Sequence, residues 1–163
     1  MTITFRNALL KDLDRIMAIE HAAFSKEEAA SRTAMRERII MIRDTFIVAT
    51  DTEDRPVGYV VGPVIEERCL YDDLFDKTVK NPQIGGYQSI LSLAVGENHQ
   101  KQGLASKLLM ALADTARTHK RKGVTLTCLE GLIPFYQKQG YVLQGVSASQ
   151  HAGEIWYDMV LDL

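Results

Sequence analysis

A strand that runs through a polar turn into an amphipathic helix constrains the fold of this 163-residue chain more than any other feature. Residues 88–95 form a largely apolar run that ends at Gly96, and a polar turn leads on to Gly103. Residues 104–119 then carry apolar side chains at every fourth position, the pattern of a helix with one buried face. The members of that stripe are Leu104, Leu108, Leu112 and Ala116. The segment indicates a fold in which strands and helices are interleaved.

Similar patterns predict the other elements, in the order β-α-α-β-β-β-α-β-α-β-β. Strands are expected at residues 2–6, 45–50, 56–65, 88–95, 124–128, 141–146 and 154–161. Helices are expected at residues 10–20, 26–43, 104–119 and 132–139. Residues 66–86 lack a regular pattern and are expected to form a long loop with one helical turn. We therefore predict one α/β (α+β) domain over residues 1–163, with a mixed, twisted central sheet of about seven strands flanked by about four helices.

Composition and charge argue against several classes of protein. The formal net charge is -2, and the one basic cluster ends a predicted helix, so a nucleic-acid partner is not expected. Cys69 and Cys128 lie far apart and the histidines lack ligand spacing, which argues against a metal site or a disulfide. No apolar stretch is long enough for a membrane span, and the N-terminus lacks a signal-peptide core. We expect a cytoplasmic protein without a membrane or nucleic-acid partner.

The turn between the strand and the helix has the properties of an anion site. The N-terminus of a helix presents unpaired N–H groups and the positive end of the helix dipole. Gly103 lets an anion approach the backbone closely, and Ala105 keeps the next turn small. Gln100, Lys101 and Gln102 add donors at the rim. Taken alone, such a turn is as often an ordinary helix start, and it matches neither the Walker motif nor the dinucleotide-binding glycine motif.

The segment Gln100-Lys101-Gln102-Gly103-Leu104-Ala105 resembles the Q/R-x-x-G-x-G/A loop of the GNAT superfamily of N-acetyltransferases. Residues 134–141 resemble a second signature of that family, an aromatic helix followed by a Gly-aromatic strand start. The resemblance implies the GNAT fold, acetyl-CoA as co-substrate and no metal. It places the pyrophosphate on the loop and the pantetheine arm against the central strand. The implied cofactor-binding residues are Leu93, Ala94, Val95, Gln100, Lys101, Gln102, Gly103, Leu104, Ala105 and Ser106.

Residues 23–31, 128–136 and 156–159 further resemble the arylalkylamine N-acetyltransferase branch and its bacterial relatives. An H-x-H pair that vertebrate members carry is absent, because Ser89 and Leu91 stand at those positions. The resemblance implies transfer of an acetyl group to a small (aryl)alkylamine or polyamine, and a possible homodimer. The alternatives are acetylation of protein N-termini or lysines, and a domain that binds acetyl-CoA without catalysis.

Acetyl transfer needs a neutral amine and a proton for the leaving thiolate. A primary ammonium of pKa near 10.4 is neutral only about once in 2500 at pH 7, so a base must take its proton. The resemblance assigns Tyr136 as the acid and Glu28 as the base. Ser89 and Ser92 are an alternative, as the holders of a water relay. Glu20 is a further candidate for the base, although its position favours a solvated helix residue. Cys128 is expected to be an inert, buried thiol.

Overall fold

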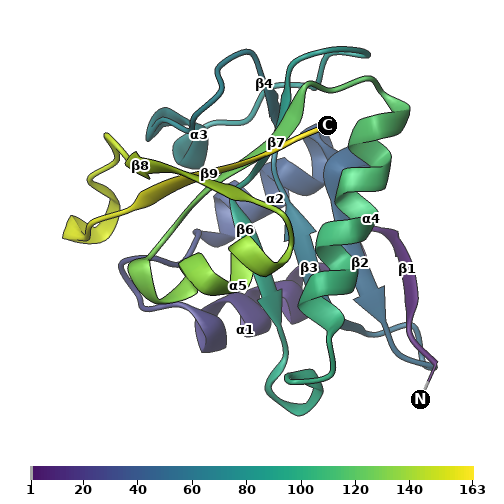
Figure 1. Cartoon of the computed structure of the whole chain (residues 1–163). Helices are drawn as coiled ribbons and strands as arrows, with labels where there is room; N and C mark the ends of the chain where they lie inside the picture. The colour runs from purple at the N-terminus through teal and green to yellow at the C-terminus, as the bar shows by residue number, and fades with distance from the viewer. Residues whose placement is uncertain (1) are drawn as a thin grey trace.

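The computed structural model describes residues 2–163, which form two sheets (Figure 1). The first sheet is antiparallel and has the strand order β1-β2-β3-β6. Its strands are β1 (Thr4–Asn7), β2 (Phe46–Thr50), β3 (Pro56–Val61) and β6 (Ser92–Val95). The second sheet has the order β4-β5-β7-β9-β8. Its strands are β4 (Val64–Ile65), β5 (Tyr87–Ile90), β7 (Gly123–Cys128), β9 (Tyr157–Asp162) and β8 (Val142–Val146).

The chain passes from the second sheet back to the first at Leu91, between β5 and β6. Before it, β5 pairs in parallel with β7, from Tyr87 opposite Gly123 to Ile90 opposite Leu126. After it, β6 pairs only with β3, in antiparallel register. The chain therefore changes strand partners at Leu91. β5 is hydrogen-bonded to β7, whereas β6, which follows it, is not. This divergence leaves one edge of β6 free of a strand partner in the part of the chain that the structure describes.

Helices cover both faces of the sheets and build two apolar cores. Helix α4 (Leu104–Thr118) and helix α5 (Ile133–Lys138) pack on one face, where Leu108 and Leu112 are fully buried. Helix α1 (Leu13–Ala23) and helix α2 (Arg32–Met41) pack on the other face. Figure 1 shows α4 on the near side of β2 and β3, with α2 behind them. A short helix, α3 (Asp73–Asp76), lies in the long loop before β5.

The mixed α/β class is confirmed, and the element count differs for local reasons. The described residues form nine strands because two expected strands are each divided. The expected strand at 56–65 breaks at Gly62, where an added Cβ would lie 2.0 Å from the Ser89 carbonyl oxygen. The expected strand at 88–95 breaks at Leu91, where the sheets separate. The fifth helix is α3, the single turn expected within the long loop.

The expected second helix, 26–43, begins later than the sequence pattern suggested. The Ser31 hydroxyl accepts from the Ala34 N–H at 3.0 Å and caps α2, which starts at Arg32. Glu28 therefore lies in the α1–α2 loop and not in the first turn of a helix. None of the described helices combines the length and apolar character needed to cross a bilayer.

Candidate active site

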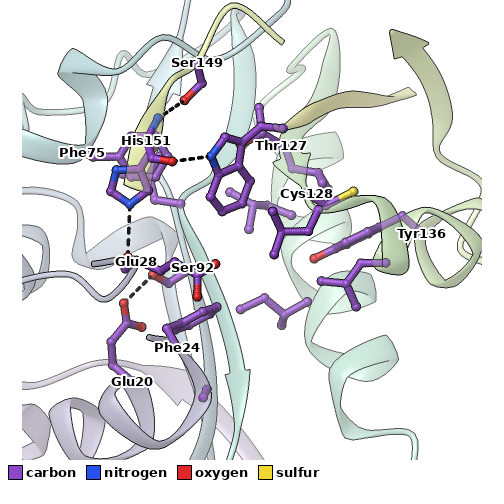
Figure 2. A pocket seen from close by; sticks show the side chains of 18 residues that line it. Glu20, Phe24, Glu28, Phe75, Ser92, Thr127, Cys128, Tyr136, Ser149 and His151 are labelled. Carbon is purple, nitrogen blue, oxygen red and sulfur yellow. Dashed lines mark hydrogen bonds between the residues drawn. The ribbon is translucent and has the colours of Figure 1, made fainter. Parts of the chain in front are cut away.

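A cavity of ≈ 210 Å³ occupies the space where β6 and β7 diverge. The ends of these strands form its floor, α5 and the residues before it form one wall, and the end of α1 forms another. Figure 2 shows the labelled side chains converging on this space from segments far apart in the sequence. The residues that line the cavity include Glu20, Phe24, Glu28, Phe75, Ser92, Cys128, Tyr136, His151 and Trp156.

The loop before α4 is built to accept an anion. Gly103 adopts φ = 77°, a left-handed conformation that favours glycine, and a Cβ there would meet nothing within 4 Å. Helix α4 begins with the bond from the Lys107 N–H to the Gly103 carbonyl at 3.1 Å. Within residues 2–163, the N–H groups of residues 104–106 have no hydrogen-bond acceptor. The loop thus presents free N–H groups beside an open approach, with Lys101 exposed at the rim.

The free edge of β6 offers main-chain groups to an extended ligand. The Gly96 N–H donates to the Val57 carbonyl at 2.8 Å. Because bonded and non-bonded pairs alternate along an antiparallel ladder, the main-chain groups of Leu93 and Val95 point away from β3. The Gln100 side chain donates to the Val95 carbonyl at 3.1 Å, so it braces this edge rather than standing at the rim as a free donor. The Leu93 and Val95 N–H groups face the cleft.

Tyr136 projects from α5 into the cavity, as Figure 2 shows. Its ring packs edge-on against Phe135 and Tyr141, with centroids 5.0 and 5.7 Å away. Burial raises the pKa of the Tyr136 phenol well above its ordinary value. A phenol with such a pKa keeps its proton at neutral pH and can donate it to a departing anion.

Cys128 ends β7 at the same wall of the cavity, and its thiol is 3.6 Å from the Met159 sulfur. Burial raises the pKa of the Cys128 thiol to about 11. The thiol is therefore protonated at neutral pH and is a poor nucleophile, which agrees with the expected inert role.

Glu28 reaches the cavity from the α1–α2 loop, but its carboxylate is held by local bonds. One oxygen accepts from the Ser25 N–H at 3.0 Å, and the Glu28 N–H donates to the Ser25 hydroxyl at 3.2 Å. The bond from the Ser25 backbone lowers the pKa of Glu28. The assignment of Glu28 as the base stays a prediction.

Glu20 is not the solvated residue that the sequence pattern suggested, since its side chain is only 1% exposed. Its carboxylate accepts from the Tyr59 hydroxyl, from the Ala30 N–H at 2.8 Å and from the Ser92 hydroxyl at 3.3 Å. Figure 2 shows Glu20 and Ser92 side by side at the base of the cavity. Ser89, the other serine of the predicted relay, donates to the Pro63 carbonyl at 2.6 Å and does not line this cavity.

Comparison with known proteins settles the family. The model of the acetyltransferase (GNAT) family matches residues 13–141, which is most of the chain. The chain belongs to the GNAT family. A comparison with curated protein sequences gave no match.

Solved GNAT structures superpose over nearly the whole of this acetyltransferase. Ard1 from Thermoplasma volcanium shares 20% identity at a TM-score of 0.79, covering 100% of this chain and 99% of its own. Arabidopsis thaliana NAA60 in complex with acetyl-CoA shares 18% identity at a TM-score of 0.75, with 99% and 100% covered. The ribosomal-protein-S18-alanine N-acetyltransferase from Escherichia coli shares 15% identity at 0.72, with 99% and 94% covered. At these identities the likeness establishes the fold.

In this GNAT enzyme, one side of the cavity is closed by contacts between three segments that are distant in the sequence. The His151 Nε2 lies 3.2 Å from the Glu28 carbonyl, and the His151 ring stacks on Phe75 with centroids 5.1 Å apart. Asp72, beside Phe75, accepts from the Ser149 hydroxyl at 2.5 Å. Trp156 donates to the His151 carbonyl at 2.8 Å and completes an aromatic wall.

Sequence reasoning missed these aromatic residues as part of the site. Phe75 lies in the irregular loop, and His151 and Trp156 follow β8, so no local pattern links them to Tyr136 or Glu28. Ser106 was expected at the anion loop; its N–H is there, while its hydroxyl accepts from the side chain of Gln139, just after α5, at 2.9 Å. Among residues 2–163 there is no cluster of side chains that could hold a metal ion.

Proposed function

We propose that this GNAT acetyltransferase moves the acetyl group of acetyl-CoA to the primary amine of a small molecule with an aromatic or aliphatic body. This deepens the family assignment, and the resemblance to arylalkylamine N-acetyltransferases supports it. The observation that carries the proposal is the closed acceptor side, where the contact between His151 and Glu28 bridges two loops over a cavity of ≈ 210 Å³. A polypeptide acceptor would have to separate these two loops in order to reach the cavity.

The residues present fit acetyl-CoA, which supplies the thioester. The free N–H groups at the start of α4, together with Lys101, would hold the pyrophosphate. The Leu93 and Val95 N–H groups would bond the pantetheine arm, and one of them would polarise the thioester carbonyl. Tyr136 would donate its phenol proton to the thiolate of the leaving CoA.

The acceptor wall suits an organic cation. Phe24, Phe75 and Trp156 present aromatic surface, and Glu20 contributes a carboxylate at the base of the cavity. Aromatic faces attract an ammonium group, and a buried carboxylate strengthens that preference. The site therefore favours a cationic amine over an uncharged acceptor.

Acceptor preference tests the proposal. We expect kcat/KM for phenethylamine to exceed that for short peptides with a free N-terminal Ala or Met by at least about 100-fold, because only the small amine fits beneath the bridged loops. The assay follows thiol release from acetyl-CoA, with spermidine as a third acceptor.

A matched pair of variants locates the acceptor. Trp156→Leu is expected to raise the KM for phenethylamine about tenfold, since an aromatic wall is lost. Tyr71→Leu, at an exposed tyrosine outside the cavity, should leave the KM unchanged. A preference for the peptides would overturn the proposal and assign the enzyme to protein N-termini, as the printed names of several structural relatives would suggest.

A further inference from the structure

The buried carboxylate of Glu20 is not needed to hold CoA, and it faces the acceptor side of the cavity. It accepts a hydrogen bond from Ser92 of β6. Ser92 directly precedes Leu93, whose main-chain groups face the cleft. The Ser92 hydroxyl donates to Glu20, and its oxygen retains acceptor capacity for an N–H of a bound ammonium. An ammonium, Ser92 and Glu20 thus form a chain along which a proton can move.

Three hydrogen-bond donors, from Tyr59, Ala30 and Ser92, surround the Glu20 carboxylate, and no cation among the described residues is paired with it. Within residues 2–163 no lysine, arginine or histidine nitrogen lies within 4 Å of the carboxylate. Arg38, itself 1% exposed, is near enough for the charge of Glu20 to oppose the lowering of the Arg38 pKa by burial. The charged or titratable groups around Glu20 include Tyr59 of β3, Arg38 and Glu37 of α2, Asp76 of α3, Glu28 of the α1–α2 loop, and His151.

We propose, on the basis of the proposed function, that Glu20 accepts the proton of the acceptor ammonium through Ser92. The ammonium N–H proton passes to the Ser92 oxygen as the Ser92 hydroxyl proton passes to a Glu20 carboxylate oxygen. The amine becomes neutral and nucleophilic, Ser92 is unchanged, and Glu20 is protonated. This transfer replaces two opposite charges by two neutral groups, which the burial of Glu20 favours relative to bulk solvent.

The geometry favours Glu20 over Glu28 for this role. Within residues 2–163 no hydrogen bond joins the Glu28 side chain to β6, and the bond from the Ser25 backbone lowers the pKa of Glu28. Glu20 lies deeper and bonds directly to a side chain of the strand that lines the cleft. Glu20 acts through Ser92 and is therefore a positioning and proton-accepting residue, while Ser92 contacts the substrate.

The test compares Glu20→Gln with wild type across pH, using phenethylamine. At pH 7 we expect kcat/KM to fall about 100-fold to 10,000-fold, the range for loss of general-base catalysis. The loss should shrink as pH approaches the pKa of the amine, because the neutral amine then forms without help. Glu53→Gln removes an equal charge from a residue that pairs with Arg55 in the turn between β2 and β3 and does not line the cavity, and it should keep wild-type activity.

A second acceptor separates this role from damage to the fold. β,β-Difluorophenethylamine has a lower ammonium pKa, so it needs less help in losing its proton. Both Glu20→Gln and Ser92→Ala should acetylate it at closer to the wild-type rate than they acetylate phenethylamine. Equal losses for the two amines, independent of pH, would overturn the relay and leave Glu20 as a structural residue.

The binding of acetyl-CoA distinguishes failure of this inference from failure of the proposed function. Both variants should bind acetyl-CoA as wild type does. If wild type acetylates the amine and the fall in kcat/KM of Glu20→Gln does not depend on pH, the relay alone is overturned. No acetylation of either amine by wild type overturns the proposed function, and the relay with it.

Discussion

Replacing Tyr136 with Phe is expected to lower kcat for amine acetylation by about 100-fold or more, while the Kd for acetyl-CoA stays within about threefold of wild type. The substitution removes only the phenol oxygen, so the packing against Phe135 and Tyr141 is kept. What is lost is the phenol proton, which a tyrosine carries at neutral pH and which burial, by raising the pKa of Tyr136, does not remove. Steady-state kinetics gives kcat, and calorimetry gives the Kd.

Tyr141→Phe is the matched control for this substitution. Tyr141 is also buried, burial also raises its pKa, and its ring contacts Tyr136, but it does not line the cavity. Its kcat should equal that of wild type. An equal fall in kcat for both variants would mean that the aromatic cluster matters only for packing, and would remove Tyr136 from the reaction.

The substitution Gly103→Glu should weaken acetyl-CoA binding at least about 100-fold, equivalent to ~2.7 kcal/mol. It places a carboxylate where the pyrophosphate would meet the free N–H groups of α4, and juxtaposed like charges cost several kcal/mol. The added side chain meets no atom within 4 Å at its Cβ, so steric damage to the fold is not expected. A thermal-shift titration measures the effect, because a ligand that binds only the native state raises stability by RT ln(1 + [L]/Kd).

Gly85→Glu controls for charge and backbone strain in this experiment. Gly85 has φ = 83°, close to the 77° of Gly103, and a Cβ there also meets nothing within 4 Å. It lies in the loop before β5, away from the start of α4. Its thermal shift with acetyl-CoA should match that of wild type. Tight binding by Gly103→Glu would contradict the placement of the pyrophosphate.

Local patterns predicted the parts of the site that a short stretch of sequence encodes. The helix at 104–119 and the aromatic helix at 132–139 are found in α4 and α5, since apolar spacing and flanking glycines define them. The burial of Glu20 was not predicted, although a local signal for it exists. Glu20 stands four residues after Ile16 and three after Met17, on the buried stripe of α1, so an acidic residue at that position marks a buried carboxylate.

Other features depend on contacts that no local pattern records. Residues 88–95 form two strands because the two sheets diverge there. That divergence depends on the pairing of β6 with β3 and of β5 with β7. The closure of the acceptor side joins Glu28, Phe75 and His151, and these residues are brought together only by the complete fold. The capping of α2 by Ser31 decided that Glu28 lies in a loop, although a helical pattern could be read through it.

The most direct test of the account is to incubate the wild-type enzyme with acetyl-CoA, labelled with carbon-13 in the acetyl group, and phenethylamine. Mass spectrometry then identifies the labelled product while a thiol assay measures free CoA. The account predicts labelled N-acetylphenethylamine in an amount equal to the CoA released, and little release without the amine. Release of CoA without the amide would contradict it, because the acetyl group would then pass to water and not to an amine.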